Sequence, residues 1–434
     1  MSTPQGPVTI IGAGPAGLCL ARYLQLHSVP CVVYEREESA EARGQGGTLD
    51  LHEESGLLTL REIGLLDDAR AMMRPEGEAM RVFDKSGKAW IDESPEKSSF
   101  FPERPEIDRG MLRDLLLGSL EPGTIQWNHG VGSTRVIDND TYEVTFLDGT
   151  SITTNILIGA DGTFSRVRPL LHSTKPTYNG ISLYDMLIPE SSMTPSIREF
   201  VGSGMCIVLG DGKAFIPQMN SAGKCKVYAE LKCDEKWLEQ NKLPETGKRE
   251  WINKLYPGWT KGVEECIMAV DESTITPRRL YAFDSKFRWS SDLSGVTIMG
   301  DAAHAMAPSG EGVNQAMKDA LELGQTLVAE LHAPPRFASL APFPLSFLPV
   351  TQTPCKPRIR RPDPKRLHKA IRRYERRMME RVAPEMWTSE ELYKCWFGPD
   401  AAKTFKGLFK WLMIWGVWDM VVGTLWRPLR GLWA

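Results

Sequence analysis

A glycine-rich turn between two short apolar segments restricts the folds open to this chain more than any other feature does. The turn has the spacing G-x-G-x-x-G and is formed by Gly12, Gly14 and Gly17. It follows an apolar run at residues 8–11, and a helical pattern at 16–27 separates it from a second apolar run at 31–34. A strand, turn, helix and strand in this order predict a βαβ unit, in which the two strands lie parallel.

This unit also has the features of a dinucleotide site. Gly12 permits a tight turn, Gly14 lets the backbone approach a pyrophosphate, and Gly17 lets the helix pack closely on the strand. The N-terminus of the helix directs free N–H groups at the phosphates. Glu35 closes the second strand and can accept hydrogen bonds from a ribose diol. A glycine turn that binds no ligand is the alternative reading of the turn alone.

Two later segments also end an apolar strand with an aspartate. Asp161 follows a strand at 154–160, and Asp301 follows a strand at 296–299 and is suited to a ribityl or ribose hydroxyl. Asp161-Gly162 is a common turn when taken alone. After Asp301, a group of residues opens a helix from about 312 to 332 and aims it at a ligand: Pro308, Gly310, Gly312 and Asn314.

A second sheet is expected elsewhere in the chain. Residues 80–92 read as a hairpin, and short alternating runs fill the region from about 178 to 275, with a hairpin turn at 210–212. We predict an α/β fold, with a Rossmann-like domain, a mostly antiparallel β-sheet domain for the substrate and a C-terminal helical region. The expected boundaries are 1–78, 100–177 and 276–332 for the first domain, 79–99 and 178–275 for the second, and 365–434 for the helices.

Two segments do not fit this plan. Residues 333–364, the proline-rich segment, hold nine of the thirty prolines, and a surface loop and an unspliced intron are the two explanations. A helical pattern rich in Arg and Lys resumes at 364–382. The last thirty residues, the tryptophan-rich tail, carry five tryptophans in apolar runs shorter than the roughly twenty residues that span a bilayer. An interfacial helix with peripheral membrane contact, a packed helix and a dimer contact are the alternatives for this tail.

Composition and charge argue against several functions. The net charge of −3 over 434 residues lacks the positive field that non-specific nucleic-acid binding needs. The eight cysteines form no C-x-x-C pair and are too few for a disulfide framework, which predicts reduced thiols in a cytoplasmic protein. The seven histidines form no metal-ligand cluster, so no metal site is expected. The N-terminus lacks the pattern of a signal peptide.

In their order, the three motifs resemble those of FAD-dependent (group A) monooxygenases of the p-hydroxybenzoate hydroxylase type. In that family the first motif binds the ADP half of FAD, the second (DG) serves FAD and NAD(P)H, and the aspartate of the third (GD) binds the ribityl chain. The resemblance covers residues 8–330. Shorter matches are similar to the tetracycline-inactivating monooxygenases: Tyr-Glu-Arg at 34–36, Ala-Arg at 42–43, Gly-Gly-Thr-Leu-Asp-Leu-His at 46–52 and Pro-Glu-Ile-x-Arg at 105–109.

The resemblance gives roles to residues that the patterns alone leave open. It implies that Asp50 and Arg109 contact FAD, that Arg43 serves NADPH, and that Arg36 belongs to the cofactor-binding set. Without the family, an arginine at the start of a helix, such as Arg109, would be read as a surface cation.

Two residues of the third motif are candidates for a direct part in catalysis. Glu311 stands where the family usually has Gln, and a second negative charge beside an anionic reduced flavin is unfavourable. We therefore expect Glu311 to be protonated, to point away from the ring, or to act on the substrate. His304 is a candidate general base, although the family's Asp-Ala-Ala-His is mainly structural.

The resemblance implies an enzyme that uses FAD, NAD(P)H and O2 to hydroxylate or epoxidise a small, electron-rich organic substrate through a flavin C4a-hydroperoxide. Detoxification and secondary metabolism are both open as its setting, and so is its oligomeric state. Apolar residues of the second sheet are expected to line the pocket or simply to pack its core: Tyr184, Met186, Phe215 and Met219. The alternatives are a flavin halogenase or reductase, and a flavin-binding regulator without catalysis. The chain lacks the halogenase signature G-W-x-W-x-I-P and a redox cysteine pair.

Overall fold

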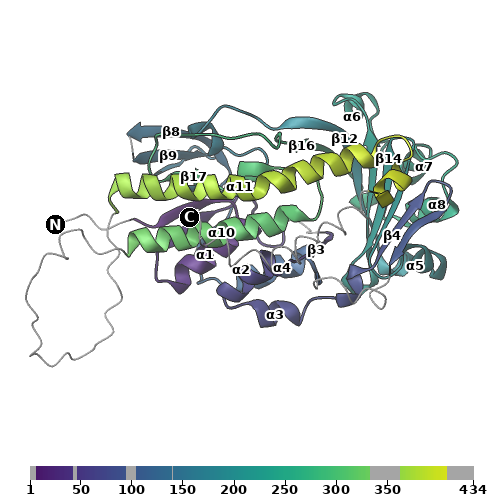
Figure 1. The fold of residues 1–434 in the computed structure, drawn as a ribbon, viewed down its shortest axis with the longest axis horizontal. Coiled ribbons are helices and arrows are strands. Elements are labelled where there is room, and N and C mark those ends of the chain that lie inside the picture. The colour runs from purple at the N-terminus through teal and green to yellow at the C-terminus, as the bar shows by residue number, and fades with distance from the viewer. Residues whose placement is uncertain (1–5, 43–45, 94–103, 139, 333–361, 408–434) are drawn as a thin grey trace, which may run out of the picture. The chain divides into compact units, whose positions relative to one another are not determined.

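The computed structural model describes residues 6–42, 46–93, 104–138, 140–332 and 362–407 (Figure 1). The chain divides into two compact units, of which the first holds residues 1–73, 102–177 and 281–388, and the second holds residues 74–101, 178–280 and 389–434. Arg43, residues 408–434 of the tryptophan-rich tail and residues 333–361 of the proline-rich segment lie outside the described residues.

A five-stranded parallel sheet forms the centre of the first unit. Its order is β17 (Val296–Ile298), β11 (Leu157–Gly159), β1 (Val8–Ile11), β2 (Cys31–Tyr34) and β7 (Ile125–Gln126). β1 is buried along its whole length, as expected for an apolar strand that is covered on both faces. With helix α1 (Pro15–Leu26), β1 and β2 form the predicted βαβ unit.

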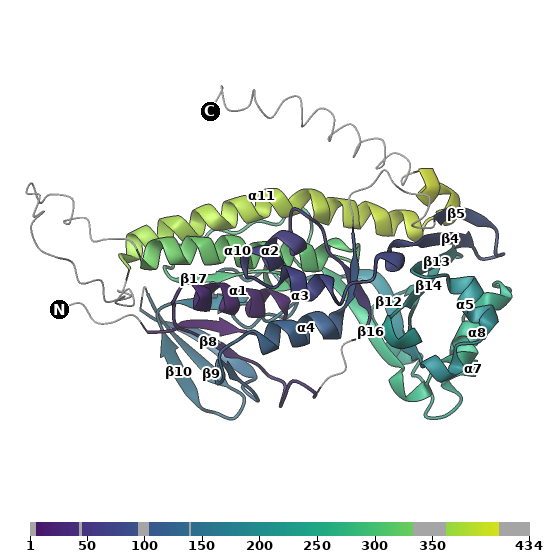
Figure 2. The ribbon, with the colours of Figure 1, turned by 90° about the horizontal axis from the view of Figure 1, so that it is seen from below.

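Helices cover one face of this sheet and a β-meander covers the other (Figure 2). The helices are α1, α10 (Glu311–Leu331) and the first part of α11 (Pro364–Trp396); the meander is β8 (Val131–Asp138), β9 (Thr141–Phe146) and β10 (Ser151–Thr154). Gly324 lets α10 approach α1, because a Cβ there would lie 2.6 Å from Cδ1 of Tyr23. α11 is tied to β17 by the Thr297 hydroxyl, which donates to the Glu375 carboxylate at 2.7 Å.

A short antiparallel pair brings two of the family matches together. β3 (Thr48–Asp50) pairs with β6 (Glu106–Asp108), so the Gly-Gly-Thr-Leu-Asp-Leu-His match lies beside the Pro-Glu-Ile-x-Arg match. The remaining helices of the first unit are α2 (Gly56–Glu62), α3 (Leu66–Arg70), α4 (Arg109–Gly118) and α9 (Asp301–His304).

The second unit is built on a seven-stranded sheet. Its order is β16 (Thr276–Ala282), β12 (Thr177–Ile188), β15 (Cys225–Lys232), β14 (Lys213–Met219), β13 (Met205–Gly210), β4 (Met80–Asp84) and β5 (Ala89–Glu93). The strands from β12 to β13 pair antiparallel, as do β4 and β5, whereas β13 and β4 pair parallel. The predicted turn joins β13 to β14 with positive φ at Asp211 (50°) and Gly212 (67°), as a tight hairpin requires. The predicted fold class is confirmed.

Helices pack on one face of this second sheet. They are α5 (Pro195–Val201), α6 (Trp237–Gln240), α7 (Lys248–Asn253) and α8 (Lys261–Ala269). Three of the candidate pocket residues, Tyr184, Met186 and Phe215, are fully buried in the core of this unit, and Met219 packs at its margin. Their apolar character is therefore explained by packing.

The helical pattern noted at 364–382 belongs to a longer helix. α11 continues through Pro384 to Trp396. Proline removes one backbone hydrogen bond from a helix. Side chains on both sides of the proline, Val382 and Met386, are buried, and their burial offsets that loss.

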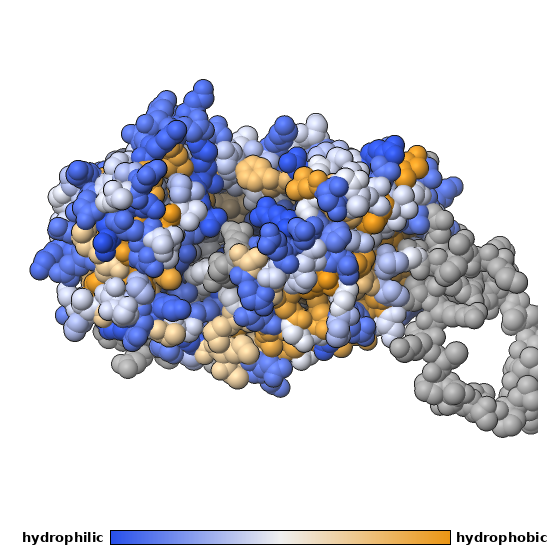
Figure 3. Space-filling model, turned by 180° about the vertical axis from the view of Figure 1, so that it is seen from behind, coloured by the Kyte–Doolittle hydropathy of each residue, from blue (hydrophilic) through white to orange (hydrophobic). Residues whose placement is uncertain are grey.

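Hydrophilic and apolar residues alternate on the face of the molecule shown in Figure 3. Among the described residues, the large apolar side chains that stay exposed come from both units: Leu26, Val136, Ile137, Leu147, Phe164, Met268 and Trp387. Within the described ranges, no helix combines the length and the apolar character needed to cross a bilayer.

Candidate functional site

The three sequence motifs meet at one edge of the parallel sheet. The Gly12 turn follows β1, Glu35 follows β2, Asp161 follows β11, and Asp301 follows β17. Because these four strands are neighbours and parallel, their carboxyl ends lie at the same edge. Open α/β sheets bind ligands at this edge. The tertiary structure therefore brings together residues that are far apart in the sequence.

The glycine turn leaves space where a ligand would approach it. Gly12 has φ +106°, and a Cβ there would lie 2.3 Å from the carbonyl oxygen of Ala160, so only glycine fits. A Cβ at Gly17 would lie 2.0 Å from the carbonyl oxygen of Gly12. At Gly14, by contrast, a Cβ would have no neighbour within 4 Å, and no described side chain caps α1. Open space beside free N–H groups is what a pyrophosphate needs.

Glu35 is fixed at the edge by the turn itself. Its Oε2 accepts a hydrogen bond from the N–H of Ala13 at 2.6 Å, and its Oε1 accepts one from the N–H of Glu37 at 3.1 Å. A carboxylate has about four acceptor positions, so positions remain for ribose hydroxyls. The neighbouring Arg36 is exposed.

The two aspartates have different surroundings. Asp161 accepts the N–H of Arg166 at 2.6 Å through Oδ2, whereas its Oδ1 is buried and has no partner in the described part of the chain. Burial raises the pKa of the Asp161 carboxyl. Asp301 is exposed, and the hydroxyl of Thr163 contacts it at 3.4 Å. Asp301 thus keeps exposed oxygen atoms for a ligand, whereas Asp161 keeps a buried oxygen without a hydrogen-bond partner among the described residues.

His304 lies beneath the site and not in it. Its side chain is 1% exposed, and its Nε2 lies 2.6 Å from Oδ2 of Asp319, which also accepts the N–H of Gly300 at 2.8 Å. Arg168 is also buried and donates to the carbonyl of Ala302 at 2.8 Å. These contacts fix the start of α9, and for His304 they favour a structural role over that of a general base.

A glycine turn precedes α10. Gly310 is the residue before the helix and has φ +91°, and a Cβ there would lie 3.2 Å from Oδ1 of Asp50. A Cβ at Gly312 would have no neighbour within 4 Å, and Pro308 is exposed. Arg109 begins α4 and is exposed, while its N–H donates to the carbonyl of Gly47 at 3.0 Å.

Asn314 holds the loop after β3 against α10. Its Oδ1 accepts hydrogen bonds from the N–H groups of His52 (3.0 Å) and Gly56 (3.3 Å) and from the hydroxyl of Ser55 (3.2 Å). Its Nδ2 donates to the carbonyl of Asp50 at 2.9 Å. The Asn314 side chain is fully buried, so it positions Asp50 and His52.

The histidine of this loop, to which the sequence gave no role, is the partner of Glu311. His52 lies between two carboxylates, with Nε2 2.9 Å from Oδ2 of Asp50 and Nδ1 3.2 Å from Oε1 of Glu311. Burial lowers the pKa of His52, but its hydrogen bonds and the charges of both carboxylates outweigh burial and raise it to about 9. Burial raises the pKa of Glu311, but the hydrogen bond and charge of His52 outweigh it, and the net shift is downward. Of the three states considered for Glu311, protonation is thus the one that this geometry argues against.

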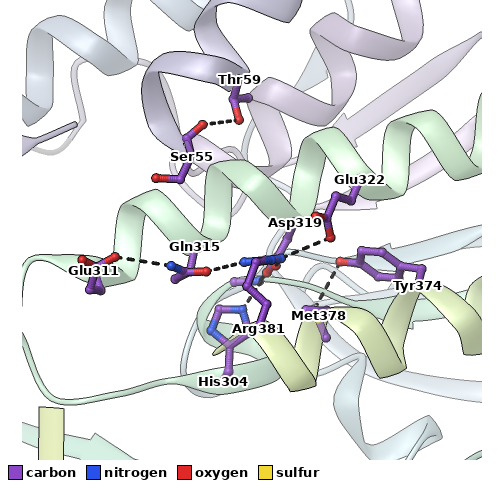
Figure 4. Close-up of polar contacts among 11 residues, drawn as sticks. Ser55, Thr59, His304, Glu311, Gln315, Asp319, Glu322, Tyr374, Met378 and Arg381 are labelled. Carbon is purple, nitrogen blue, oxygen red and sulfur yellow. Dashed lines mark hydrogen bonds and ion pairs between the residues drawn. The ribbon is translucent and has the colours of Figure 1, made fainter. Parts of the chain in front are cut away.

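A chain of polar contacts continues from Glu311 along α10 (Figure 4). Gln315 donates to Glu311 at 3.3 Å, and Arg381 of α11 donates to Gln315 and, at 2.7 Å, to the fully buried Asp319. The spacing of 311, 315 and 319 places these three residues on one helix face, a signal that the sequence does contain. Nothing in the sequence indicates Arg381, because its partners lie on another helix.

Comparison with known proteins shows the family to which this chain belongs. A family model described as an FAD binding domain matches residues 5–337. The chain belongs to this family. The predictions of an FAD-dependent monooxygenase family and of FAD as the cofactor are confirmed.

Individual relatives agree with the family. The monooxygenase penA of Penicillium thymicola is 28% identical over 374 residues, which cover 75% of this chain and 85% of that protein. Among solved structures, Klebsiella pneumoniae HpxO in complex with FAD and uric acid has a TM-score of 0.69 at 21% identity and covers 94% of this chain and 92% of its own. The tetracycline destructase Tet(51) has a TM-score of 0.64 at 18% identity and covers 93% and 95%.

The groups at the sheet edge fit the chemistry of FAD. The open backbone at Gly14 suits the pyrophosphate, the free acceptor positions of Glu35 suit the adenosine ribose, and the exposed carboxylate of Asp301 suits a ribityl hydroxyl. The open space at Gly312, at the N-terminal end of a long helix, suits a group that becomes negative on reduction.

Proposed function

We propose that this flavoprotein is an NAD(P)H-dependent monooxygenase that transfers one oxygen atom of O2 to a small, electron-rich organic substrate. The observation that carries the proposal is the meeting of the Gly12 turn, Glu35, Asp161 and Asp301 at the carboxyl edge of one parallel sheet in a chain of the FAD-binding family. Bound FAD would supply hydride acceptance and oxygen activation, and the protein would supply position and electrostatics.

We assign the parts of the edge to the parts of the cofactor. Gly12, Gly14 and Gly17 hold the pyrophosphate at the start of α1, and Glu35 holds the adenosine ribose. The ribityl side of FAD is met by a second group: Asp50, Arg109, Asp161, Asp301, Pro308, Gly310 and Gly312. Arg36, which is exposed beside Glu35, serves the adenosine side, and Arg43 serves NADPH. Asn314 acts through the loop that its side chain holds.

Two features prepare the N-terminal end of α10 for negative charge. The first turn of a helix presents unpaired N–H groups and the positive end of the helix dipole. Glu311 opposes this effect with its own charge, but the contact of 3.2 Å to His52 balances that charge. The helix end can therefore still stabilise a reduced flavin, although Glu311 replaces the Gln that is usual in the family.

We propose that the second unit binds the substrate on the sheet face opposite the helix-covered core. The register pairs Asp185 with Tyr228 and Leu183 with Glu230, so polar groups stand on the face that Tyr184 does not share. Glu230 is 3% exposed, the hydroxyl of Tyr393 donates to its Oε1 at 3.5 Å, and its Oε2 has no partner among the described residues. Burial raises the pKa of Glu230 to about 8, against the smaller opposing effect of that hydrogen bond. A carboxyl group that stays protonated can donate to a substrate oxygen. HpxO is solved with uric acid and Tet(51) is a tetracycline destructase, so electron-rich ring compounds are the first substrates to test.

A substrate screen tests this function. Purified protein should be yellow and should oxidise NADPH faster when a substrate is present, and mass spectrometry should find one added oxygen in the product. NADPH oxidation that yields only H2O2 with every compound of a phenol, enol and purine panel would contradict monooxygenation. Protein that releases no flavin on denaturation would contradict the flavin site itself.

The variant Asp301→Ala tests the assigned cofactor edge. It should retain less FAD than the wild-type protein, because the exposed carboxylate that would meet the ribityl chain is lost. Asp114→Ala, on the exposed side of α4, is the matched control and should keep full flavin. Equal flavin content in both variants would refute the role of Asp301.

A further inference from the structure

Both ring nitrogens of His52 face acidic oxygens. Nε2 lies 2.9 Å from Asp50 and Nδ1 lies 3.2 Å from Glu311. A neutral imidazole has only one N–H, so only the imidazolium donates to both carboxylates. The ring is 17% exposed, and the carboxylates of Asp50 and Glu311 are 32% and 22% exposed. The three side chains form a partly buried cluster, the acid–imidazolium cluster, in which one cation separates two anions.

Other charged groups from the packed elements face this cluster. Arg104, just before β6, lowers the pKa of Glu311 by its charge, after the larger effects of burial and His52. On α11, burial and the charge of Glu311 raise the pKa of Glu385 to about 7, against the opposing charges of His52, Arg104 and Arg381. The charge of Glu311 therefore acts on Glu385 as well as on His52. His52 is a cation in direct contact with Glu311.

Backbone contacts fix the position of His52 beside Glu311, which distinguishes this pair from a chance pair of surface side chains. The N–H of His52 is held by Asn314, which lies one turn of α10 after Glu311. Asp50, the other partner of the ring, ends β3 and lies against Gly310, where a Cβ would come within 3.2 Å of its Oδ1. The cluster therefore spans the loop after β3 and the first turn of α10, at the helix end assigned to the flavin.

We propose that His52 is a positioning residue of the flavin site, whose imidazolium holds Asp50 and balances the charge of Glu311, so that an acidic residue can stand at the N-terminal end of α10 without weakening FAD binding. This inference rests on the proposed assignment of that helix end to the flavin. A charge-balancing role predicts the direction in which each substitution shifts the flavin potential, which a merely structural role does not. Asp50, His52 and Glu311 sum to −1, removal of the imidazolium makes the sum −2, and neutralisation of Glu311 in addition returns it to −1.

The test compares His52→Ala, Glu311→Gln and the double variant with the wild-type protein. The readouts are the Kd for FAD, from titration of the apoprotein, and the midpoint potential of the bound flavin. His52→Ala should raise the Kd by about tenfold and make the potential more negative, because added negative charge disfavours the reduced flavin. Glu311→Gln should make the potential less negative, and the double variant should return close to wild type. His368→Ala is the matched control, since its ring is half-buried and, among the described residues, is hydrogen-bonded to the carbonyl of Leu293.

Several results would overturn the inference. His52→Ala with the Kd and potential of the wild type would remove any role for the ring, and a defect that Glu311→Gln does not relieve would reduce His52 to a structural residue. If His52→Ala does not fold, His52→Gln loses the charge but keeps a donor, and it should shift the potential in the same direction. A wild-type protein that binds no FAD would defeat the flavin site as well, whereas a wild-type protein that binds FAD beside unaffected His52 variants would defeat this inference alone.

Discussion

Replacement of Arg381 by methionine tests the contact that joins α11 to the polar face of α10. Arg381 donates to Gln315, to Asp319 at 2.7 Å and to Glu322 at 3.4 Å (Figure 4). Methionine keeps most of the side-chain volume but removes the guanidinium. Asp319 is 0% exposed, so the substitution takes the guanidinium away from a buried carboxylate.

The magnitude follows from what Asp319 keeps. Removal of one partner of a buried ion pair costs about 3–5 kcal/mol. Asp319 retains His304 at 2.6 Å and the N–H of Gly300 at 2.8 Å, which reduces the expected loss to about 2–3 kcal/mol. At roughly 2–4 °C per kcal/mol for a domain of this size, the Tm should fall by about 5–10 °C.

Thermal unfolding followed by circular dichroism measures this change. Arg376→Met is the matched control, because Arg376 is exposed on the same helix and its substitution should stay within about 0.5 kcal/mol. Asp319→Asn in the Arg381→Met background removes the stranded charge and should recover part of the loss. If Arg381→Met melts within about 1 °C of the wild type, the reasoning about this buried pair is refuted.

Three further changes have defined outcomes. Gly12→Ala should abolish FAD retention, because a Cβ would lie 2.3 Å from the carbonyl oxygen of Ala160. Gly118→Ala is the control and should keep its FAD, because a Cβ there has no neighbour within 4 Å. Full flavin content in Gly12→Ala would argue against the turn as the pyrophosphate site. The pKa of His52 is raised from 6.5 to about 9, so the stability that its charge contributes is fully present below about pH 6.5 and is lost as the pH rises through about 9. Urea unfolding of the wild type should therefore show a loss of about 3 kcal/mol in the free energy of unfolding over this range, and His52→Ala should not show it. Because burial raises the pKa of Glu230 from 4.5 to about 8, the wild type should lose stability as the pH rises between these values, and Glu230→Gln should be more stable than the wild type at neutral pH; parallel pH profiles of the two proteins would contradict this.

Much of the fold was predictable because its signals are local. The Gly12 turn needs glycine for its φ of +106°, and the tight turn at 211–212 needs two residues with positive φ. The strands at 8–11 and 31–34 were predictable from their apolar composition. The end of α11 was not predictable in this way, since the burial of Met386 by distant residues decides whether the helix continues through Pro384.

The sequence by itself determined the family and the cofactor, and it predicted a cofactor site at the glycine turn, because spacing along the chain fixes the local backbone that a dinucleotide needs. It left the state of Glu311 open. Only the tertiary structure decided that His52 stands beside Glu311 and that Arg381 holds the far end of the same polar chain. The physical reason is that the charge a carboxyl carries depends on burial and on neighbours through space, which the order of residues does not contain.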